Sequence, residues 1–434
     1  MFSFRWLFLA FFFPGILSAQ SPVPAQAQKG AVLILGATAH LGNGKVLPNA
    51  AIAFQQGKIT MVADATTIRI DRNQFAQIYD ASGKHVYPGL IATDSQLGLV
   101  EIEAVRATVD QAEVGAYNPN ARALIAYNTD SHITPTVRSN GVLLAQICPV
   151  GGVLSGSSSV VQLDAWNWED AAVRVDEGQH LNWPSTRSWG GWESGSPEQK
   201  ANDQYAKQLD AITDLFESAR AYAQLTAPTV VNPRFEAMRP LFQQKQTLYI
   251  HANEAGQLRD AVYFAERMGL KMVLVGATDA WQETTLLREK QVPVIIARTQ
   301  RLPSREDEAV DLPYKTPALL HAAGIRFAFS EDGSWKQRNL AFQAGQAVGA
   351  GLPYEAAITA LTLEPARMMG IDHLYGSIET GKSATLLISD GDILDMRTNR
   401  INAAFIDGRS IDLDNKQKEL SRKYQEKYDR KKQE

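Results

Sequence analysis

Apolar and polar residues alternate over short distances near both ends of the chain. Between residues 30 and 80, short apolar runs are separated by Gly, Asn and Pro, and the sequence QQGK at 55–58 lies between two such runs. This pattern is typical of short strands joined by a hairpin. Residues 376–396 and 401–413 have the same texture. We therefore expect β-rich segments at 30–85 and 371–413, on both sides of the middle of the chain.

The middle, residues 86–370, alternates between strand-like and helix-like stretches. Apolar runs of strand length lie at 141–148, 247–253, 271–277, 292–297 and 325–332, and helix-like stretches lie at 257–270, 280–291 and 312–324. The first of these helices has an apolar stripe made of Leu258, Val262, Ala265 and Met268, and ends at Gly269. Strands that alternate with helices predict parallel βαβ units. Their number favours an α/β fold with a (β/α)8 barrel of the TIM type over an open sheet, although counting alone does not decide between the two.

The first residues have the order of a secretory signal peptide. Arg5 precedes an apolar run at 6–17, which is followed by the small residues Ser18 and Ala19. We expect residues 1–19 to be a signal peptide and 20–29 a leader on an exported chain, with the periplasm as its compartment. An uncleaved anchor is the alternative, but the run is short for a membrane span, so no span is expected after cleavage.

Composition and charge narrow the class of protein. The chain has 434 residues, of which 45% are hydrophobic, and a net charge of -4 with acids and bases mixed along it. A nucleic-acid-binding protein should carry a concentrated basic face, and this mixed distribution does not suggest one. The single cysteine, Cys148, allows no internal disulfide and is expected to be a buried small hydrophobe rather than a reactive thiol. Residues 414–434 are almost wholly polar, which predicts a solvated helix or a frayed end rather than a binding arm.

Two stretches carry a resemblance to a known family. The run V-Y-P-G-L-I at 86–91 leads into the first strand of the middle part, and residues 359–388 contain E-P-A-x-x-x-G followed by G-x-I-x-x-G-K-x-A. Over residues 30–413 the chain resembles the amidohydrolase superfamily, in particular its imidazolonepropionase-like members, although Ala384-Thr385-Leu386 replaces the usual A-D-L. The resemblance implies a metal-dependent hydrolase fold. It consists of a (β/α)8 barrel and a small β-sandwich formed by the N- and C-terminal segments.

The resemblance also implies a metal site at the carboxyl ends of the barrel strands. Its ligands in the family are an H-x-H pair on strand 1, a Lys or Glu on strand 4, a His on strands 5 and 6, and an Asp on strand 8. On strand 1, this sequence has Asp94 and Gln96 at the two histidine positions. Such oxygen ligands favour Mg²⁺, Mn²⁺ or Ca²⁺ over Zn²⁺. The alternative is that both are polar strand-end residues hydrogen-bonded to loops.

The remaining family positions are only partly kept. His251 occupies the strand 5 position, while Gly276 stands where strand 6 has its His and offers no ligand. On strand 8, Asp332 matches the family Asp, which takes a proton from the metal-bound water, and the neighbouring Glu331 should point to the opposite face. No residue is assigned on strand 4. The implied metal set is therefore His251, Asp332, Asp94 and Gln96, with Asp332 as the catalytic residue.

A stretch of small residues at 149–159 follows the strand at 141–148. We interpret it as a loop whose backbone N–H groups could hold an anion, and as part of the pocket lining. It lacks the G-K-[ST] pattern of a phosphate loop. The predicted pocket residues are Gly151, Gly152, Ser155, Gly156 and Gly276.

Two functions stay open at this point. The first is an exported hydrolase of carbon–nitrogen bonds other than peptide bonds, with Zn²⁺, Mn²⁺ or Mg²⁺ as cofactor and a small molecule as substrate. The second is a metal-free, non-catalytic family member that serves as a binding or partner subunit in the periplasm. As partners we expect a second copy of the chain or an active relative.

Overall fold

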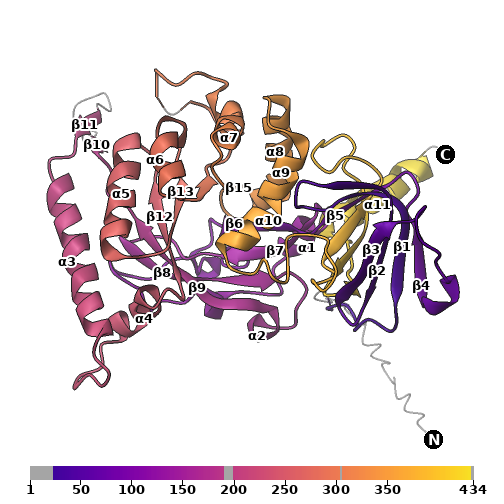
Figure 1. The fold of residues 1–434 in the computed structure, drawn as a ribbon, viewed down its shortest axis with the longest axis horizontal. Coiled ribbons are helices and arrows are strands. Elements are labelled where there is room, and N and C mark those ends of the chain that lie inside the picture. Colours follow the sequence, from indigo (N-terminus) through magenta and orange to yellow (C-terminus); the bar gives the residue numbers. More distant parts are fainter. Residues whose placement is uncertain (1–22, 190–198, 304, 432–434) are drawn as a thin grey trace, which may run out of the picture.

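The computed structural model describes residues 23–189, 199–303 and 305–431. The predicted signal peptide and the first residues of the leader lie outside this part. Within it, no helix is both long enough and apolar enough to cross a membrane. Two bodies follow one another along the longest axis of the molecule, a barrel and a smaller β domain (Figure 1).

The barrel contains eight strands in sequential order. They are β6 (Leu90–Ser95), β7 (Val142–Ile147), β8 (Leu154–Gln162), β9 (Ala172–Asn182), β12 (Thr247–Ala252), β13 (Met272–Gly276), β14 (Val294–Ile296) and β15 (Phe327–Phe329). A parallel bridge between Thr93 and Ser330 brings the last strand back to the first. The predicted TIM-type barrel is confirmed. It differs from the ideal form in β8, which runs antiparallel to both of its neighbours.

Helices follow most of the parallel strands. They are α1 (Thr134–Arg138), α2 (Trp168–Ala171), α3 (Tyr205–Ala223), α4 (Pro233–Phe242), α5 (Ala255–Met268), α6 (Thr284–Glu289), α7 (Leu312–Ala322), α8 (Leu340–Gly349), α9 (Tyr354–Leu361), α10 (Leu363–Met368) and α11 (Lys416–Lys431). The apolar stripe predicted for α5 is buried against the barrel, and Gly269 ends this helix with a φ of 69°. Both predictions for this helix are confirmed.

The smaller domain is a second eight-stranded sheet built from both ends of the chain. Its strands are β1 (Val32–His40), β2 (Val46–Gln55), β3 (Lys58–Asp64), β4 (Gln77–Asp80), β5 (His85–Pro88), β16 (Leu386–Ser389), β17 (Ile401–Ile406) and β18 (Arg409–Ser410). The predicted hairpin at 55–58 joins β2 to β3. A short hairpin of β10 (Arg187–Trp189) and β11 (Gln199–Ala201) lies before α3, at the far end of the barrel (Figure 1).

The interpretation of residues 154–159 as a loop is wrong. They form the first two thirds of β8, and all nine residues of this strand are buried. The polar side chains find partners inside the sheet: Ser158 donates to Glu177, and Ser155 donates to the carbonyl oxygen of Gly151. Because these hydroxyls are satisfied locally, a serine-rich run can be a buried strand.

The barrel and the β domain are joined by a buried ion-pair network. Asp164 accepts a hydrogen bond from Arg138 of α1 at 2.6 Å and another from Arg409 of β18 at 2.9 Å. Side-chain exposure is only 3% for Asp164 and 5% for Arg138. The backbone N–H of Ala25 donates to the second oxygen of the same carboxylate. One carboxylate therefore holds the barrel, the β domain and the start of the described chain together.

Replacing this carboxylate should strongly destabilise the protein. Asp164→Ala leaves the buried charge of Arg138 without its partner, which costs about 3–5 kcal/mol of the free energy of unfolding. Chemical denaturation followed by circular dichroism measures the change. The control is Arg397→Ala, which removes a pair whose arginine is 84% exposed and should change stability by less than about 1 kcal/mol. Equal effects of the two substitutions would contradict the proposed role of Asp164.

Candidate functional site

The carboxyl ends of β6, β7, β9 and β12 bring a group of polar side chains together inside the barrel. On β6, a register shift between Ala92 and Ser95 places Asp94 in a left-handed backbone conformation with a φ of 48°. Asp tolerates this conformation better than most residues, at some cost in strain. The backbone N–H of Asp94 donates to Oε1 of Gln146 at 3.0 Å, which fixes the irregular turn.

A buried carboxylate, that of Glu177, is linked to Asp94 through the side chain of Gln146. Glu177 of β9 accepts hydrogen bonds from Gln146 (2.6 Å), Ser158 (2.6 Å) and the hydroxyl of Tyr249 (2.8 Å). Burial raises the pKa of Glu177, although these three donors oppose the shift. The donors come from three different strands, so Glu177 fixes the register of the barrel interior around the site.

His180 is the central residue of the group. Its ring stacks on Tyr249 with centroids 4.9 Å apart, and its Nδ1 lies 2.9 Å from Nε2 of His251. The ring of Tyr249 can occupy this place because Gly178 has no side chain; a Cβ there would lie 2.3 Å from it. His180 is fully buried, and its Nε2 has no hydrogen-bond partner among the described residues. Burial holds the pKa of His180 well below its usual value of 6.5, and His251 lowers it further.

Three side chains converge closely enough to hold a metal ion. Ligand atoms of Asp94, Cys148 and His180 all lie within 4.8 Å of one another. His251 adjoins the group, with its Nε2 4.0 Å from Oδ1 of Asp94. Burial raises the pKa of the Cys148 thiol, and the carboxylates of Asp94 and Glu177 raise it further. A divalent cation would stabilise the thiolate form of Cys148 and would satisfy the unpartnered nitrogen of His180. These donors therefore fit a metal ion.

The other residues predicted for the metal site lie apart from this group. Gln96 is nearly buried, and its Nε2 donates to the carbonyl oxygen of Asp94 at 3.3 Å. Asp332 is 61% exposed and forms ion pairs with Arg298 at 3.3 Å and Lys336 at 3.8 Å. Metal binding by Gln96 and catalysis by Asp332 therefore stay predictions. Glu331 is the buried member of the strand 8 pair and accepts from Gln343.

Gly276 ends β13 in a backbone conformation that excludes a histidine ligand. Its φ is 86°, and a Cβ built there would lie 2.6 Å from Oδ1 of Asn253. A side chain at this position would be strained and would clash. The lack of an imidazole on strand 6 is thus tied to the local backbone.

Three of the predicted pocket residues, Gly151, Gly152 and Ser155, contact Asn182, the last residue of β9, and none of the five lines the cavity beside it. Gly151 and Gly152 form the turn before β8, and Nδ2 of Asn182 donates to the carbonyl oxygen of Gly152 at 2.9 Å and to Oγ of Ser155 at 3.0 Å. Asn182 also lines a cavity of about 480 Å³ that extends to α3. Asn182 pairs in register with His251, but His251 itself does not line this cavity. Gly156 lies within β8 and packs against the backbone of Ala121.

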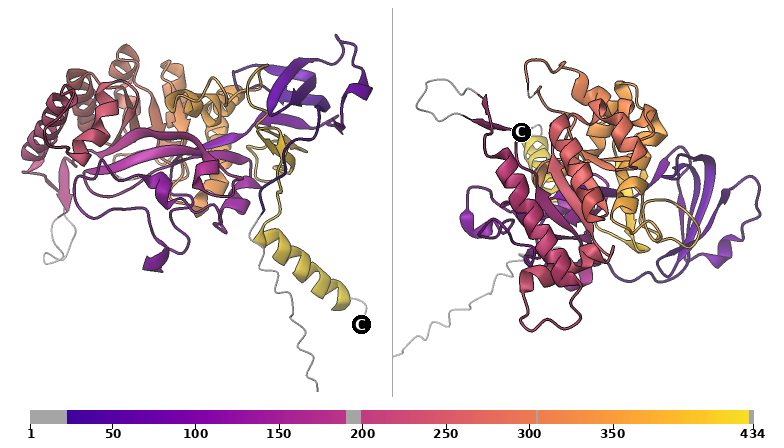
Figure 2. Two further views of the ribbon diagram at one scale, coloured as in Figure 1. Left: turned by 90° about the horizontal axis from the view of Figure 1, so that it is seen from below. Right: turned by 60° about the vertical axis from the view of Figure 1, so that its left-hand side comes forward.

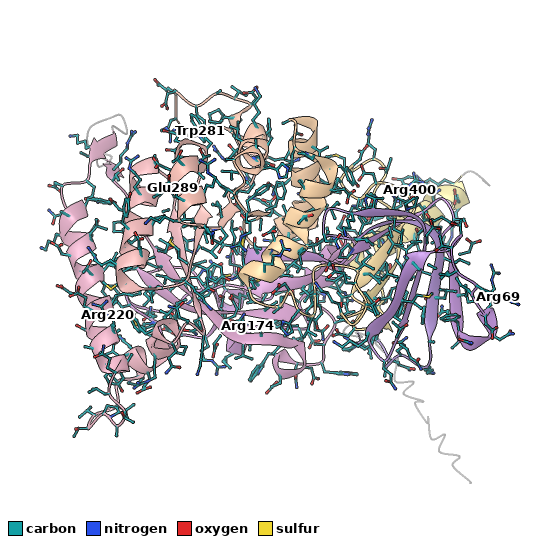
Figure 3. All side chains as sticks on the ribbon, in the orientation of Figure 1. Arg69, Arg174, Arg220, Trp281, Glu289 and Arg400 are labelled. Carbon is teal, nitrogen blue, oxygen red and sulfur yellow. The ribbon has the colours of Figure 1, made fainter. Side chains whose placement is uncertain are left out.

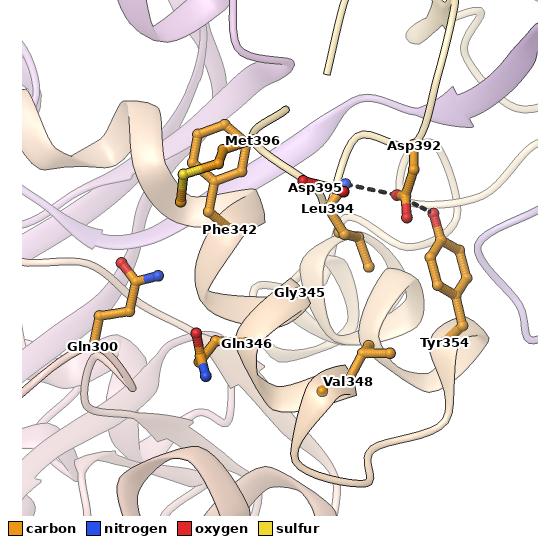
Figure 4. A pocket seen from close by; sticks show the side chains of 11 residues that line it. Gln300, Phe342, Gly345, Gln346, Val348, Tyr354, Asp392, Leu394, Asp395 and Met396 are labelled. Carbon is orange, nitrogen blue, oxygen red and sulfur yellow. Dashed lines mark hydrogen bonds between the residues drawn. The ribbon is translucent and has the colours of Figure 1, made fainter. Parts of the chain in front are cut away.

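A second cavity lies away from this group. It measures about 310 Å³ and is lined by residues of α8, α9 and the loop after β16, among them Phe342, Tyr354 and Asp392 (Figure 4). The hydroxyl of Tyr354 donates to Asp392 at 2.6 Å. Neither of these two cavities is lined by Asp94, Cys148, His180 or His251. Figure 3 shows the side chains on the ribbon, with Trp281 and Arg174 on opposite sides of the barrel in this view.

His180 and Cys148 are the residues that sequence reasoning missed. His180 lies on strand 4, the position left unassigned, and Cys148 was expected to be a small hydrophobe. A histidine in the run G-Q-H-L-N, directly after two acidic residues, was the available signal for strand 4. No comparable signal existed for Cys148, because its neighbours in the site come from distant parts of the chain.

Comparisons with known proteins agree with this fold. The sequence model of the amidohydrolase family matches residues 243–412, from the residue after α4 to just beyond β18. A search of curated proteins gives no match. Among solved structures, an amidohydrolase from Thermotoga maritima has a TM-score of 0.76 at 23% identity, with 88% of this chain and 99% of that chain covered.

Two further solved structures share the fold at lower similarity. A molinate hydrolase has a TM-score of 0.52 at 16% identity and covers 89% of this chain and 95% of its own. An adenosine deaminase from Xanthomonas campestris with bound zinc has a TM-score of 0.51 at 17% identity, with 94% and 99% covered. The barrel with its small β domain is therefore a fold that this chain shares with these structures. The family match covers less than half of the chain, and over residues 243–412 the chain is similar to the amidohydrolase family.

The buried imidazole of His180 should make stability depend on pH. Its folded-state pKa lies well below 6.5, so below that pH the unfolded chain binds a proton that the folded chain does not. Stability of the metal-free protein should therefore fall as pH drops from 6.5 to 5, by at most about 1.4 kcal/mol per pH unit from this residue. Urea unfolding of the wild type and His180→Gln at several pH values measures the difference. The variant should lose part of the slope, whereas the control His132→Gln, whose side chain is exposed, should keep it.

Proposed function

We propose that the chain is an exported hydrolase that depends on a divalent metal and acts on carbon–nitrogen bonds other than peptide bonds. One observation carries the proposal: among the described residues, the buried Nε2 of His180 has no hydrogen-bond partner, and its side chain is grouped with those of Asp94 and Cys148. A buried polar atom without a partner is costly, and bound metal is one of the few ways to satisfy it. The match to the amidohydrolase family over residues 243–412 supports the reaction class, and the signal-peptide pattern of residues 1–19 supports export.

Asp94, Cys148 and His180 would hold the metal ion. Three protein ligands of the imidazole, thiolate and carboxylate types leave one position open, which is the arrangement of catalytic zinc sites. A thiolate and an imidazole also favour Zn²⁺ over the harder ions expected from Asp94 and Gln96 alone. When bound, such an ion polarises a carbonyl group and lowers the pKa of bound water to about 7.

The residues around the ligands would position them and move protons. Glu177 holds Gln146, which in turn holds the backbone of Asp94, so the carboxylate of Asp94 has one orientation. The side chain of His251 is 25% exposed and lies 4.0 Å from Asp94, so its ring would be accessible to exchange a proton with a substrate.

Metal binding tests the proposal directly. We expect the metal-free chain to take up one Zn²⁺ ion per molecule and to melt at a higher temperature when Zn²⁺ is added. His180→Gln and Cys148→Ala should each weaken binding by at least about 100-fold, because each removes a ligand. Isothermal titration calorimetry and metal analysis give stoichiometry and affinity. His132→Gln serves as the control. Equal affinity in the His180 variant and the wild type would contradict the assignment.

A non-catalytic role is the second candidate, and two observations favour it. Gly276 provides no ligand, and Asp332 is engaged by Arg298 and Lys336 rather than by the polar group. Such a member would keep the barrel and its cavity but act as a binding subunit in the periplasm, paired with a second copy or with an active relative. Fold membership does not decide between the two roles.

Substitution of Asp332 distinguishes a hydrolase from a non-catalytic binding protein. In a hydrolase that uses this carboxylate as proton acceptor, Asp332→Asn should lower turnover of a panel of amides and cyclic amides by about 10²–10⁴-fold and leave Zn²⁺ affinity unchanged. A non-catalytic member would show no turnover in the wild type and unchanged ligand binding in the variant. The control is Asp307→Asn, which removes a carboxylate whose side chain is 78% exposed. Wild-type turnover that survives Asp332→Asn would remove this residue from the catalytic machinery.

A further inference from the structure

Helix α11 projects from the body of the protein and carries an unusual charge for this chain. The helix has 16 residues, so it is about 24 Å long, and its far end points away from the barrel (Figure 2, left). It contains seven Lys and Arg and three Asp and Glu, a net charge of +4. The whole chain carries -4, so the rest of it carries -8.

An apolar stripe follows one side of this helix. Leu420, Tyr424 and Tyr428 are spaced four residues apart, so they lie on one face. They are 37%, 50% and 55% exposed, and no residue of α11 is buried. Aromatic side chains left in water along a projecting helix have no structural role within the described chain.

The lysines without ion pairs lie beside this stripe. Lys423, Lys427 and Lys431 each follow one of the three apolar residues by three positions, and none of them has an ion-pair partner among the described residues. Lys427 already lies 5.8 Å from the ring centre of Tyr424. One face therefore combines tyrosines with unpaired positive charge.

The acidic residues of α11 are engaged elsewhere. Glu419 is paired with Lys416, Glu426 with Arg430, and Asp429 accepts a hydrogen bond from Gln425. Arg422 forms its ion pair with Asp414, which precedes the helix. The negative charges therefore do not neutralise the lysines next to the tyrosines.

We propose that this face of α11 binds the surface of an anionic phospholipid bilayer. Tyrosine rings prefer the boundary between headgroups and acyl chains, and lysines beside them gain from the negative surface potential. At the far end of the helix, the negative charge of the rest of the protein only weakly opposes binding to an anionic membrane. The distance of that end from the body, up to 24 Å, exceeds the screening length of about 8–10 Å at physiological salt.

The position of α11 in the molecule also supports binding to a membrane. Its first turn is held on the barrel by hydrogen bonds from Thr136 to Gln417 and from Asn415 to Ser139. In the same region, Asp164 fixes Arg138 of α1 and the backbone of Ala25. The described chain thus starts at the corner from which α11 projects. The apolar run at 6–17, which we expect to be part of a signal peptide, precedes Ala25 by a few residues in the sequence.

Vesicle binding of the chain from residue 20 onward tests the proposal. We expect cosedimentation with vesicles of phosphatidylglycerol and phosphatidylcholine at 3:7, little binding to phosphatidylcholine alone, and loss of binding at high salt. The double substitution Lys427→Gln with Lys431→Gln should weaken binding about 25-fold. Tyr424→Ser with Tyr428→Ser should also weaken it, because the rings no longer enter the interface.

Matched controls keep the test specific to this face. Lys418→Gln with Arg422→Gln changes the charge of α11 equally but on the opposite side, and Tyr263→Ser removes an exposed tyrosine from α5; both should bind as the wild type does. Equal binding to neutral vesicles, or equal loss in the lysine controls, would overturn the proposal. So would sedimentation without vesicles that disappears in the Lys427 and Lys431 variant, since the helix would then bind a second copy.

Discussion

The buried carboxylate of Glu177 needs a hydrogen-bond donor for each oxygen, and this need organises the interior of the barrel. Its donors, Gln146, Ser158 and Tyr249, come from β7, β8 and β12. A carboxylate buried without such donors would cost several kcal/mol. The antiparallel β8 is part of the same arrangement, because it delivers a serine hydroxyl where a helix would otherwise follow β7.

Two residues of this network, Gln146 and Tyr249, also contact residues of the site. Gln146 accepts the backbone N–H of Asp94 and so supports a left-handed residue at the end of β6. Tyr249 provides the surface on which His180 stacks. The side chains that contact His180 therefore hold its ring in place, and Nε2 stays without a hydrogen-bond partner among the described residues. A flexible ring would turn toward a hydrogen-bond acceptor.

Much of the fold follows from the sequence because strand and helix signals are local. The apolar runs at 247–253 and 271–277 and the stripe of α5 give the alternation of a parallel barrel, and the closing motif at 359–388 carries the family. The strand at 154–162 could not be recognised, because its serines are polar by composition and buried only through partners that are distant in sequence. His251 and Asp94 were found through family positions. His180 and Cys148 belong to the group through tertiary proximity, which no spacing in the sequence expresses.

The types of ligand that this site offers depend on the backbone conformation at the ends of the strands. At Gly276 the left-handed conformation and the nearness of Asn253 leave no room for an imidazole, while at Asp94 another left-handed residue presents a short carboxylate. A site without an imidazole at Gly276 can draw its donors only from strand ends that are already close. Cys148, directly after β7, and His180 on β9 occupy such ends. Their thiol and imidazole would shift the site back toward zinc, although strand 1 offers only oxygen.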